Sequence, residues 1–130
     1  MRDYEMMRRI LVTCYTGGEN LEFCNFVSIT SKEYKEKETE FEKELNRLSD
    51  EGLLEHNMYW KCGTLMDGVV KGLTPAGVEF ARMISDTKVW AVCSKTLKKA
   101  ELDISYPLIK KVCERIIENI VLSCIPDEFK

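Results

Sequence analysis

A long polar helix closed by a glycine is the feature that most constrains the fold of this chain. Thr30 and Glu33 have capping-box spacing at its start, and Gly52 marks its end. The stretch 35–40 has no apolar residue, so the pattern permits one helix that projects into solvent or a division near Thr39. The apolar residues that would form its buried stripe are Tyr34, Phe41, Leu45 and Leu48.

Two β-compatible runs and another helix follow this polar helix. The first run passes through residues 58–60 and the second covers residues 69–73, with a turn-rich interval between them that contains Gly63 and Asp67-Gly68. Thr74-Pro75 then predicts a helix start, because threonine caps helices well and proline is tolerated at the first helical position. The expected apolar face of that helix contains Val78, Ala81 and Ile84.

The N-terminal residues predict one further helix. Asp3 can cap it, and Gly17-Gly18 would end it. Residues 21–27 fit a short strand or an irregular linker. The apolar positions of this first helix are Tyr4, Met7, Ile10, Leu11 and Cys14. Helices, then a strand hairpin, then a helix is the order of a winged helix, in which the hairpin is the wing and the helix before it is the recognition helix.

The C-terminal third predicts two additional helices. The first contains Trp90, which we interpret as a core residue because Val89, Cys93 and Leu97 share its helix. The second begins near Pro107 and has a broad apolar face, which would cover the core or form a dimer interface. That face contains Ile109, Val112, Cys113, Ile116, Ile117, Ile120, Val121 and Cys124. The expected fold is therefore a mostly helical α+β single domain over residues 1–130. It would combine a winged helix-turn-helix (residues 1–85, with a two- or three-stranded wing) and a helical extension (residues 86–130).

Four blocks of this chain resemble a known family. They are Arg2-Asp3 with residues 7–11, residues 50–54, residues 73–80 and residues 86–90. In these blocks the chain is similar to an uncharacterised family of small winged-helix proteins of bacteria and phages, which includes the YjcQ-like proteins. The resemblance implies a winged-helix fold and a phage or prophage setting, and it implies no established activity.

The sequence contains no recognisable catalytic or metal-binding motif. The one histidine, His56, has no partner at metal-ligand spacing, and no nucleophile motif or phosphate-binding glycine loop occurs. We interpret Gly77 as a close helix contact. The six cysteines lack close pairs and a signal peptide, so they are expected to be thiols in a bacterial cytoplasm. We expect no enzyme, no cofactor, no metal and no membrane contact.

Charge is distributed unevenly along the chain, whose formal net charge is −3. The presumed recognition helix, residues 32–51, contains five basic and eight acidic residues, a balance of −3. Such a helix would be repelled by the phosphates that line a DNA groove. Residues 86–115 contain seven basic and four acidic residues, a balance of +3. These charges favour a protein partner over nucleic acid.

The predicted function is a non-enzymatic binding module that modulates a host protein through its acidic helix. The partner-binding residues would be Glu36, Glu40, Glu44, Arg47 and Asp50. The alternative is a dimeric DNA-binding regulator, whose nucleic-acid contacts would be Arg8, Arg9, Lys61, Lys71, Lys95, Lys98 and Lys99. A homodimer would use Ile109, Val112, Ile116 and Ile120. A second alternative is an accessory protein whose main property is self-association.

Overall fold

The computed structural model of the chain describes residues 2–17, 21–22, 38–57, 59–61, 64–67 and 69–129. These residues divide into two compact units, Arg2–Arg82 and Met83–Lys130. The predicted residues Tyr34 and Glu36 and the capping pair Thr30 and Glu33 lie outside the described residues.

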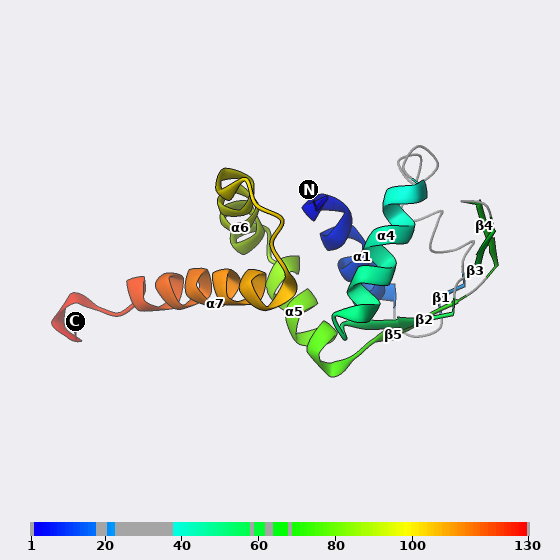
Figure 1. Ribbon diagram of the computed structural model, residues 1–130. Coiled ribbons are helices and arrows are strands. Elements are labelled where there is room, and N and C mark those ends of the chain that lie inside the picture. Colours follow the sequence, from blue (N-terminus) through cyan, green and yellow to red (C-terminus); the bar gives the residue numbers. More distant parts are fainter. Residues whose placement is uncertain are drawn as a thin grey trace. The chain divides into compact units, whose positions relative to one another are not determined.

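The first unit combines helices with a small antiparallel sheet (Figure 1). Helix α1 (Tyr4–Gly17) is followed by the short strand β1 (Leu21–Glu22), and α4 (Glu38–Asp50) precedes β2 (Leu54–His56). Strands β3 (Tyr59–Lys61) and β4 (Thr64–Asp67) pair with each other, β5 (Val69–Leu73) returns to the sheet, and α5 (Pro75–Ser85) follows.

Strand β5 is the centre of a three-stranded sheet. The strand order is β1-β5-β2, and both pairings are antiparallel. The β3-β4 hairpin connects β2 to β5. A hairpin in this position, with α4 before it and a helix after it, is the arrangement of a winged helix, so the predicted fold class is confirmed.

The turn-rich interval of the wing differs from the prediction. Residues 64–67 were expected to belong to the turn, but they form β4 and pair with β3, with Lys61 opposite Thr64. Thr-Leu-Met-Asp has only two apolar residues, and a pairing partner on β3 supplies the hydrogen bonds that local pattern alone does not predict.

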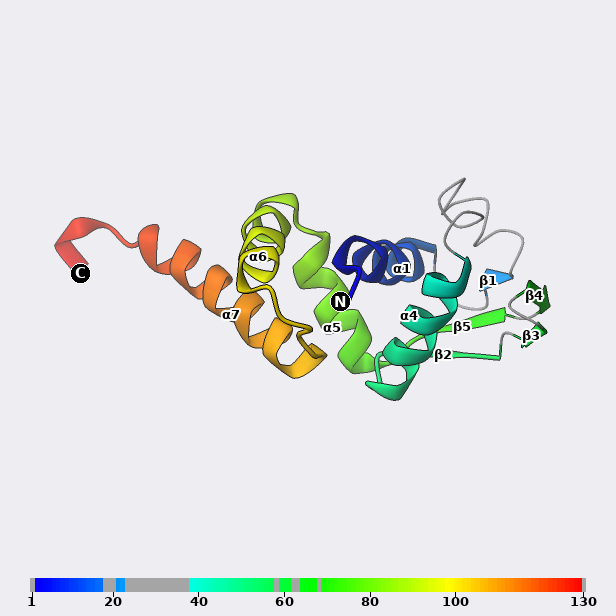
Figure 2. The same cartoon turned by 45° about the horizontal axis from the view of Figure 1, so that its top comes forward.

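Helices α1 and α4 pack against each other in this unit, as both views show (Figures 1 and 2). The predicted apolar residues of α1 are all buried, and so are Phe41, Leu45 and Leu48 of α4. Asp3 caps α1, because its Oδ1 accepts a hydrogen bond from the Met6 N–H at 3.0 Å. Gly52 follows α4 with φ of 77°, a left-handed conformation that favours glycine.

A set of hydrogen bonds joins the end of α4 to the start of α5. Thr74 Oγ1 donates to the Gly52 carbonyl at 2.6 Å and accepts from the Gly77 N–H at 3.1 Å, while the Thr74 N–H donates to the Leu53 carbonyl at 3.0 Å. A Cβ atom on Gly77 would lie 1.9 Å from the Leu53 oxygen. The interpretation of Gly77 as a close helix contact is therefore confirmed.

The second unit contains two helices in contact, α6 (Thr87–Ala100) and α7 (Tyr106–Ser123), followed by a 3-10 turn at Asp127–Phe129. Asp86 caps α6 by accepting from the N–H groups of Lys88 and Val89. Trp90, Cys93 and Leu97 are buried, which confirms that Trp90 is a core residue.

Candidate functional site

A buried arginine joins the N-terminus of the chain to α4. The Arg2 side chain is fully buried, and its Nε donates to Glu44 Oε1 at 2.8 Å. The same guanidinium forms a two-pronged contact with Glu51, in which Nη1 donates to Oε2 at 3.1 Å and Nη2 donates to Oε1 at 2.6 Å. This planar fork suits carboxylates, and lysine could not reproduce it. We call Arg2, Glu44 and Glu51 the Arg2 cluster.

Burial and ion pairing have opposite effects on the pKa values of Arg2 and Glu44. Burial raises the pKa of Glu44, and the positive charge of Arg2 opposes that rise. For Arg2, burial lowers the pKa, but the hydrogen bond to Glu51 and the attraction of Glu44 outweigh it and raise the pKa overall. Arg2 therefore stays charged, and the net effect of burial within the cluster is the raised pKa of Glu44. Removing one member of such a cluster leaves an uncompensated charge in the interior.

The Arg2 cluster changes the surface of α4. Glu44 was predicted to bind a partner, but it is 6% exposed and ion-paired, so that expectation is corrected. Its position explains the burial, because Glu44 lies three residues after Phe41 and four before Leu48, on the stripe that faces the core. Over residues 40–51 there are five acidic and two basic residues, and Arg2 engages two of the acidic ones. Outside the Arg2 cluster three acidic and two basic residues remain, a balance of −1. The cluster, with two carboxylates and one guanidinium, carries a further −1, so Arg2 changes the total from −3 to −2.

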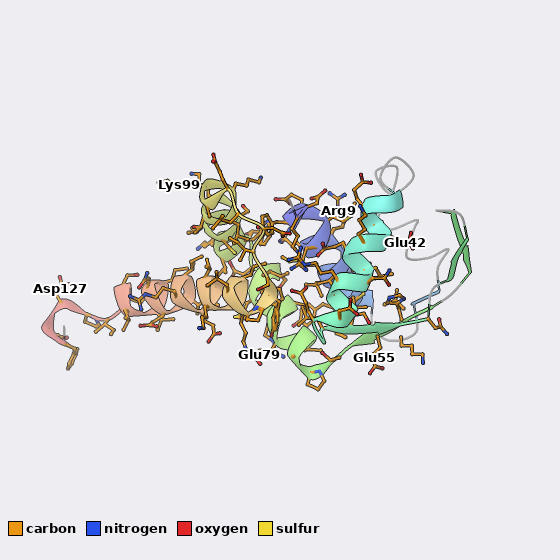
Figure 3. The ribbon with its side chains drawn as sticks, viewed as in Figure 1. Arg9, Glu42, Glu55, Glu79, Lys99 and Asp127 are labelled. Atoms are coloured by element: carbon orange, nitrogen blue, oxygen red, sulfur yellow. The ribbon has the colours of Figure 1, made fainter. Side chains whose placement is uncertain are left out.

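The exposed face of α4 is mixed in charge and polarity. Glu40, Lys43, Asn46 and Asp50 are exposed, and Arg47 is half-buried. Glu42, also half-buried, lies on the same helix (Figure 3). We call Glu40, Lys43, Asn46, Arg47 and Asp50 the α4 face. Of the predicted acidic contacts, Glu40 and Asp50 lie on this face with Arg47, and Glu36 lies outside the described residues.

The predicted nucleic-acid contacts of the first unit lie on three elements. Arg8 is half-buried and Arg9 is exposed on α1, where Figure 3 labels Arg9. Lys71 is exposed on β5. Lys61 belongs to β3, and its side chain lies outside the described part of the structure.

The remaining predicted nucleic-acid contacts lie on α6 in the second unit. Lys95, Lys98 and Lys99 are all exposed there, and Figure 3 shows Lys99 near the C-terminal end of the helix. Residues 87–100 contain four lysines and no acidic residue. The second unit thus has a basic helix surface of its own.

The predicted dimer residues of α7 fall into two groups. Ile109 is fully buried within the chain, so it is unavailable to a second copy and that expectation is corrected. Val112 and Ile116 are half-buried, and Ile120 is 42% exposed. Helix α6 packs against the first part of α7, and α7 extends beyond α6, as Figures 1 and 2 show.

Neither His56 nor any acidic group forms a metal site in the described part of the chain, where no group of three or more His, Cys, Asp or Glu side chains could hold an ion. His56 is half-buried at the end of β2; burial lowers its pKa, and Asp50 opposes that effect. In the described ranges, no helix combines the length and the apolar character needed to cross a bilayer.

Sequence reasoning missed the Arg2 cluster, although Arg2 belongs to one of the blocks that carry the family resemblance. The available signals were the position of Glu44 on the apolar stripe of α4 and the seven-residue spacing to Glu51, which is two helical turns. Neither signal identifies the cation that meets these carboxylates.

Comparison with known proteins identifies one family. No curated protein and no solved structure shows a significant match to the chain. The model of a family described as "Hypothetical protein (DUF2513)" matches residues 1–103. The match confirms that the chain resembles a family of hypothetical proteins, and the family shown is DUF2513. The finer resemblance to the YjcQ-like proteins stays a prediction. The chain belongs to the DUF2513 family of hypothetical proteins.

Proposed function

We propose that the chain is a non-enzymatic winged-helix protein that binds duplex DNA through the α4 face. The observation that carries this proposal is the Arg2 cluster, because Arg2 pairs with two of the carboxylates whose negative charge disfavours DNA binding. The preference for a protein partner rested on a balance of −3 for the recognition helix. With Arg2 counted, the balance of residues 40–51 falls from −3 to −2, and the residues of α4 outside the Arg2 cluster carry only −1.

The residue types of the α4 face suit the edges of bases. Lysine and arginine donate to guanine, asparagine pairs with adenine, and carboxylates accept from the amino group of cytosine. In a winged helix the recognition helix enters the major groove, where these groups are displayed. Lys71, exposed on β5, is available to a phosphate, which would fix the orientation of the unit on the duplex.

Selection from a random-sequence duplex library at low salt tests the proposal, followed by fluorescence anisotropy on the selected duplex. We expect a discrete complex and an affinity that falls steeply with salt. The double substitution K43A/N46A should weaken binding to the selected duplex about tenfold or more, since each base contact contributes about 1–3 kcal/mol. The control K111A removes an exposed lysine from α7 and should leave the affinity within about twofold.

The rival is the protein-binding module predicted from the sequence, a modulator of a host protein in a phage or prophage setting. Glu40 and Asp50 remain exposed on α4 and favour a basic partner surface. The double reversal E40K/D50K separates the two proposals. If α4 enters the major groove, the reversal should also change which duplex sequence is preferred, because Glu40 and Asp50 lie on the α4 face. The matched reversal E114K/E118K on exposed carboxylates of α7 adds the same charge and should raise affinity for all duplexes alike. Equal effects of the two reversals would favour the rival. Absence of any complex at micromolar wild-type protein would retire the DNA proposal and leave the rival.

A further inference from the structure

Two buried cysteines meet between the helices of the second unit. Cys93 lies on α6 and Cys113 on α7, both are fully buried, and their Sγ atoms are 3.4 Å apart. The other cysteines whose side chains are described differ from them. Cys14 is buried in α1 of the first unit, and Cys124 is exposed at the end of α7.

We infer that Cys93 and Cys113 are an oxidation site, at which hydrogen peroxide converts the two thiols into a disulfide that links α6 to α7. The inference is independent of the function proposed for α4, because it concerns the other unit of the chain. It departs from the expectation that all the cysteines act only as thiols.

The distance between the sulfurs allows the bond to form with small movements. A disulfide has an S–S length of about 2.05 Å, so the two atoms must approach by about 1.4 Å. Rotation of both side chains about χ1 can supply most of that approach, and small shifts of the two helices the rest. The two sulfurs already face each other, so α6 and α7 keep their packing when the bond forms.

The chemistry proceeds in two balanced steps. The Cys93 thiolate attacks one oxygen of hydrogen peroxide, the O–O bond breaks, and the products are a sulfenic acid on Cys93 and hydroxide. The Cys113 sulfur then attacks the sulfenic sulfur, the S–O bond breaks, and water leaves as the disulfide forms. Overall, two thiols and one peroxide give one disulfide and two waters.

The hydrogen bond between the two sulfurs favours this order of events. It lowers the pKa of Cys93 and raises the pKa of Cys113, and burial adds to the rise at Cys113. Cys93 is therefore the better thiolate of the pair, and a thiolate is the form that reacts with peroxide. By contrast, burial raises the pKa of Cys14 to about 12, which makes Cys14 a poor nucleophile.

Burial of the pair also determines which oxidant can act. Hydrogen peroxide is close to water in size and can reach the sulfurs when the contact between α6 and α7 opens briefly. Oxidised glutathione is much larger and would need α6 and α7 to separate. We therefore expect peroxide to be the faster oxidant by at least tenfold at equal concentration.

Peptide mapping of the full chain after peroxide treatment tests the inference. Free thiols are blocked by alkylation, and the protein is digested without reduction. We expect a linked Cys93-Cys113 peptide, lighter by two hydrogen atoms than the sum of its parts and lost on treatment with dithiothreitol. The melting temperature of the wild-type chain should rise by several degrees on oxidation, because the cross-link restricts the unfolded chain between the two residues.

Two single substitutions give the matched comparison. C93A removes the reactive thiol and should abolish both the linked peptide and the rise in melting temperature. C14A removes another buried thiol and should leave both unchanged. The wild-type result alone decides the matter if C93A does not fold. Oxidation of Cys124 without any Cys93-Cys113 peptide would overturn the inference.

Discussion

Arg2 is the residue on which the first unit depends most. Its guanidinium is fully buried and bonded to Glu44 and Glu51, which lie 42 and 49 positions further along the chain. The bonds therefore fix the N-terminus of the chain against both the middle and the end of α4. An apolar residue at this position could fill the space but would leave two carboxylates without their cation.

Replacing Arg2 with methionine should lower the free energy of unfolding by about 3–5 kcal/mol, the range for breaking a buried ion pair. Urea unfolding followed by circular dichroism measures this loss. The triple substitution R2M/E44L/E51Q removes the stranded charges as well and should recover most of the stability.

The control for Arg2 is K111A, which removes an exposed cation and should change stability by less than about 0.5 kcal/mol. A loss for R2M no larger than that of K111A would mean that the Arg2 cluster contributes nothing to the fold. In that case the carboxylates of α4 would also be free to face a partner, and the DNA proposal would lose its main support.

At the scale of elements, the contact of α5 with the turn after α4 sets the geometry of the winged helix. Gly77 approaches the Leu53 backbone so closely that a Cβ atom would lie 1.9 Å from its oxygen and 2.9 Å from its carbonyl carbon. Both neighbours are backbone atoms, and the same oxygen accepts the hydrogen bond from Thr74. The Leu53 backbone cannot shift away without breaking its hydrogen bond to Thr74.

The substitution G77A should destabilise the chain by about 2 kcal/mol or more, although alanine is the better helix former by about 1 kcal/mol. Thermal or urea unfolding gives the difference. G52A is the matched comparison, because that glycine has a left-handed φ but open space around it, so only backbone strain of about 1–2 kcal/mol is expected. Equal or greater stability of G77A than of the wild type would contradict the close contact.

At the scale of the whole molecule, the apolar stripe of α7 bears on self-association. Its first residues, Ile109 and Cys113, are buried within the chain, and the stripe continues through Ile116 to Ile120. Val121 beside it is 60% exposed. A second copy of this chain that pairs through its own α7 would cover the continuation of the stripe.

We expect the wild-type chain to form dimers that I120E weakens, since a carboxylate in that interface would lose its water without a partner. Light scattering or sedimentation over a range of concentrations measures the effect. L122E is the control, because Leu122 is 48% exposed on the same helix but lies on the opposite side from Ile120. A wild type that stays monomeric at high concentration would remove the dimer, and equal weakening by both variants would place the interface elsewhere.

Local signals in the sequence were enough to predict most helix limits. Asp3, Gly52 and Thr74 act within a few residues of their own position, as cap or helix end, and the structure places each in that role. The burial of Phe41, Leu45 and Leu48 also followed from spacing alone. The strand at residues 64–67 did not, because its pairing with β3 compensates for a weak local pattern.

By itself the sequence determined the order of the described helices and of the wing between them, the winged-helix class and the apolar stripes, because caps, turns and periodicity depend on neighbours in the chain. The pairing of Arg2 with Glu44 and Glu51, and of Cys93 with Cys113, was decided only by the tertiary structure. These partners are far apart in the chain, and nothing local selects one carboxylate or one thiol over another. The charge that α4 presents outward depends on such a pairing, so its preference for DNA or protein could not be read from composition alone.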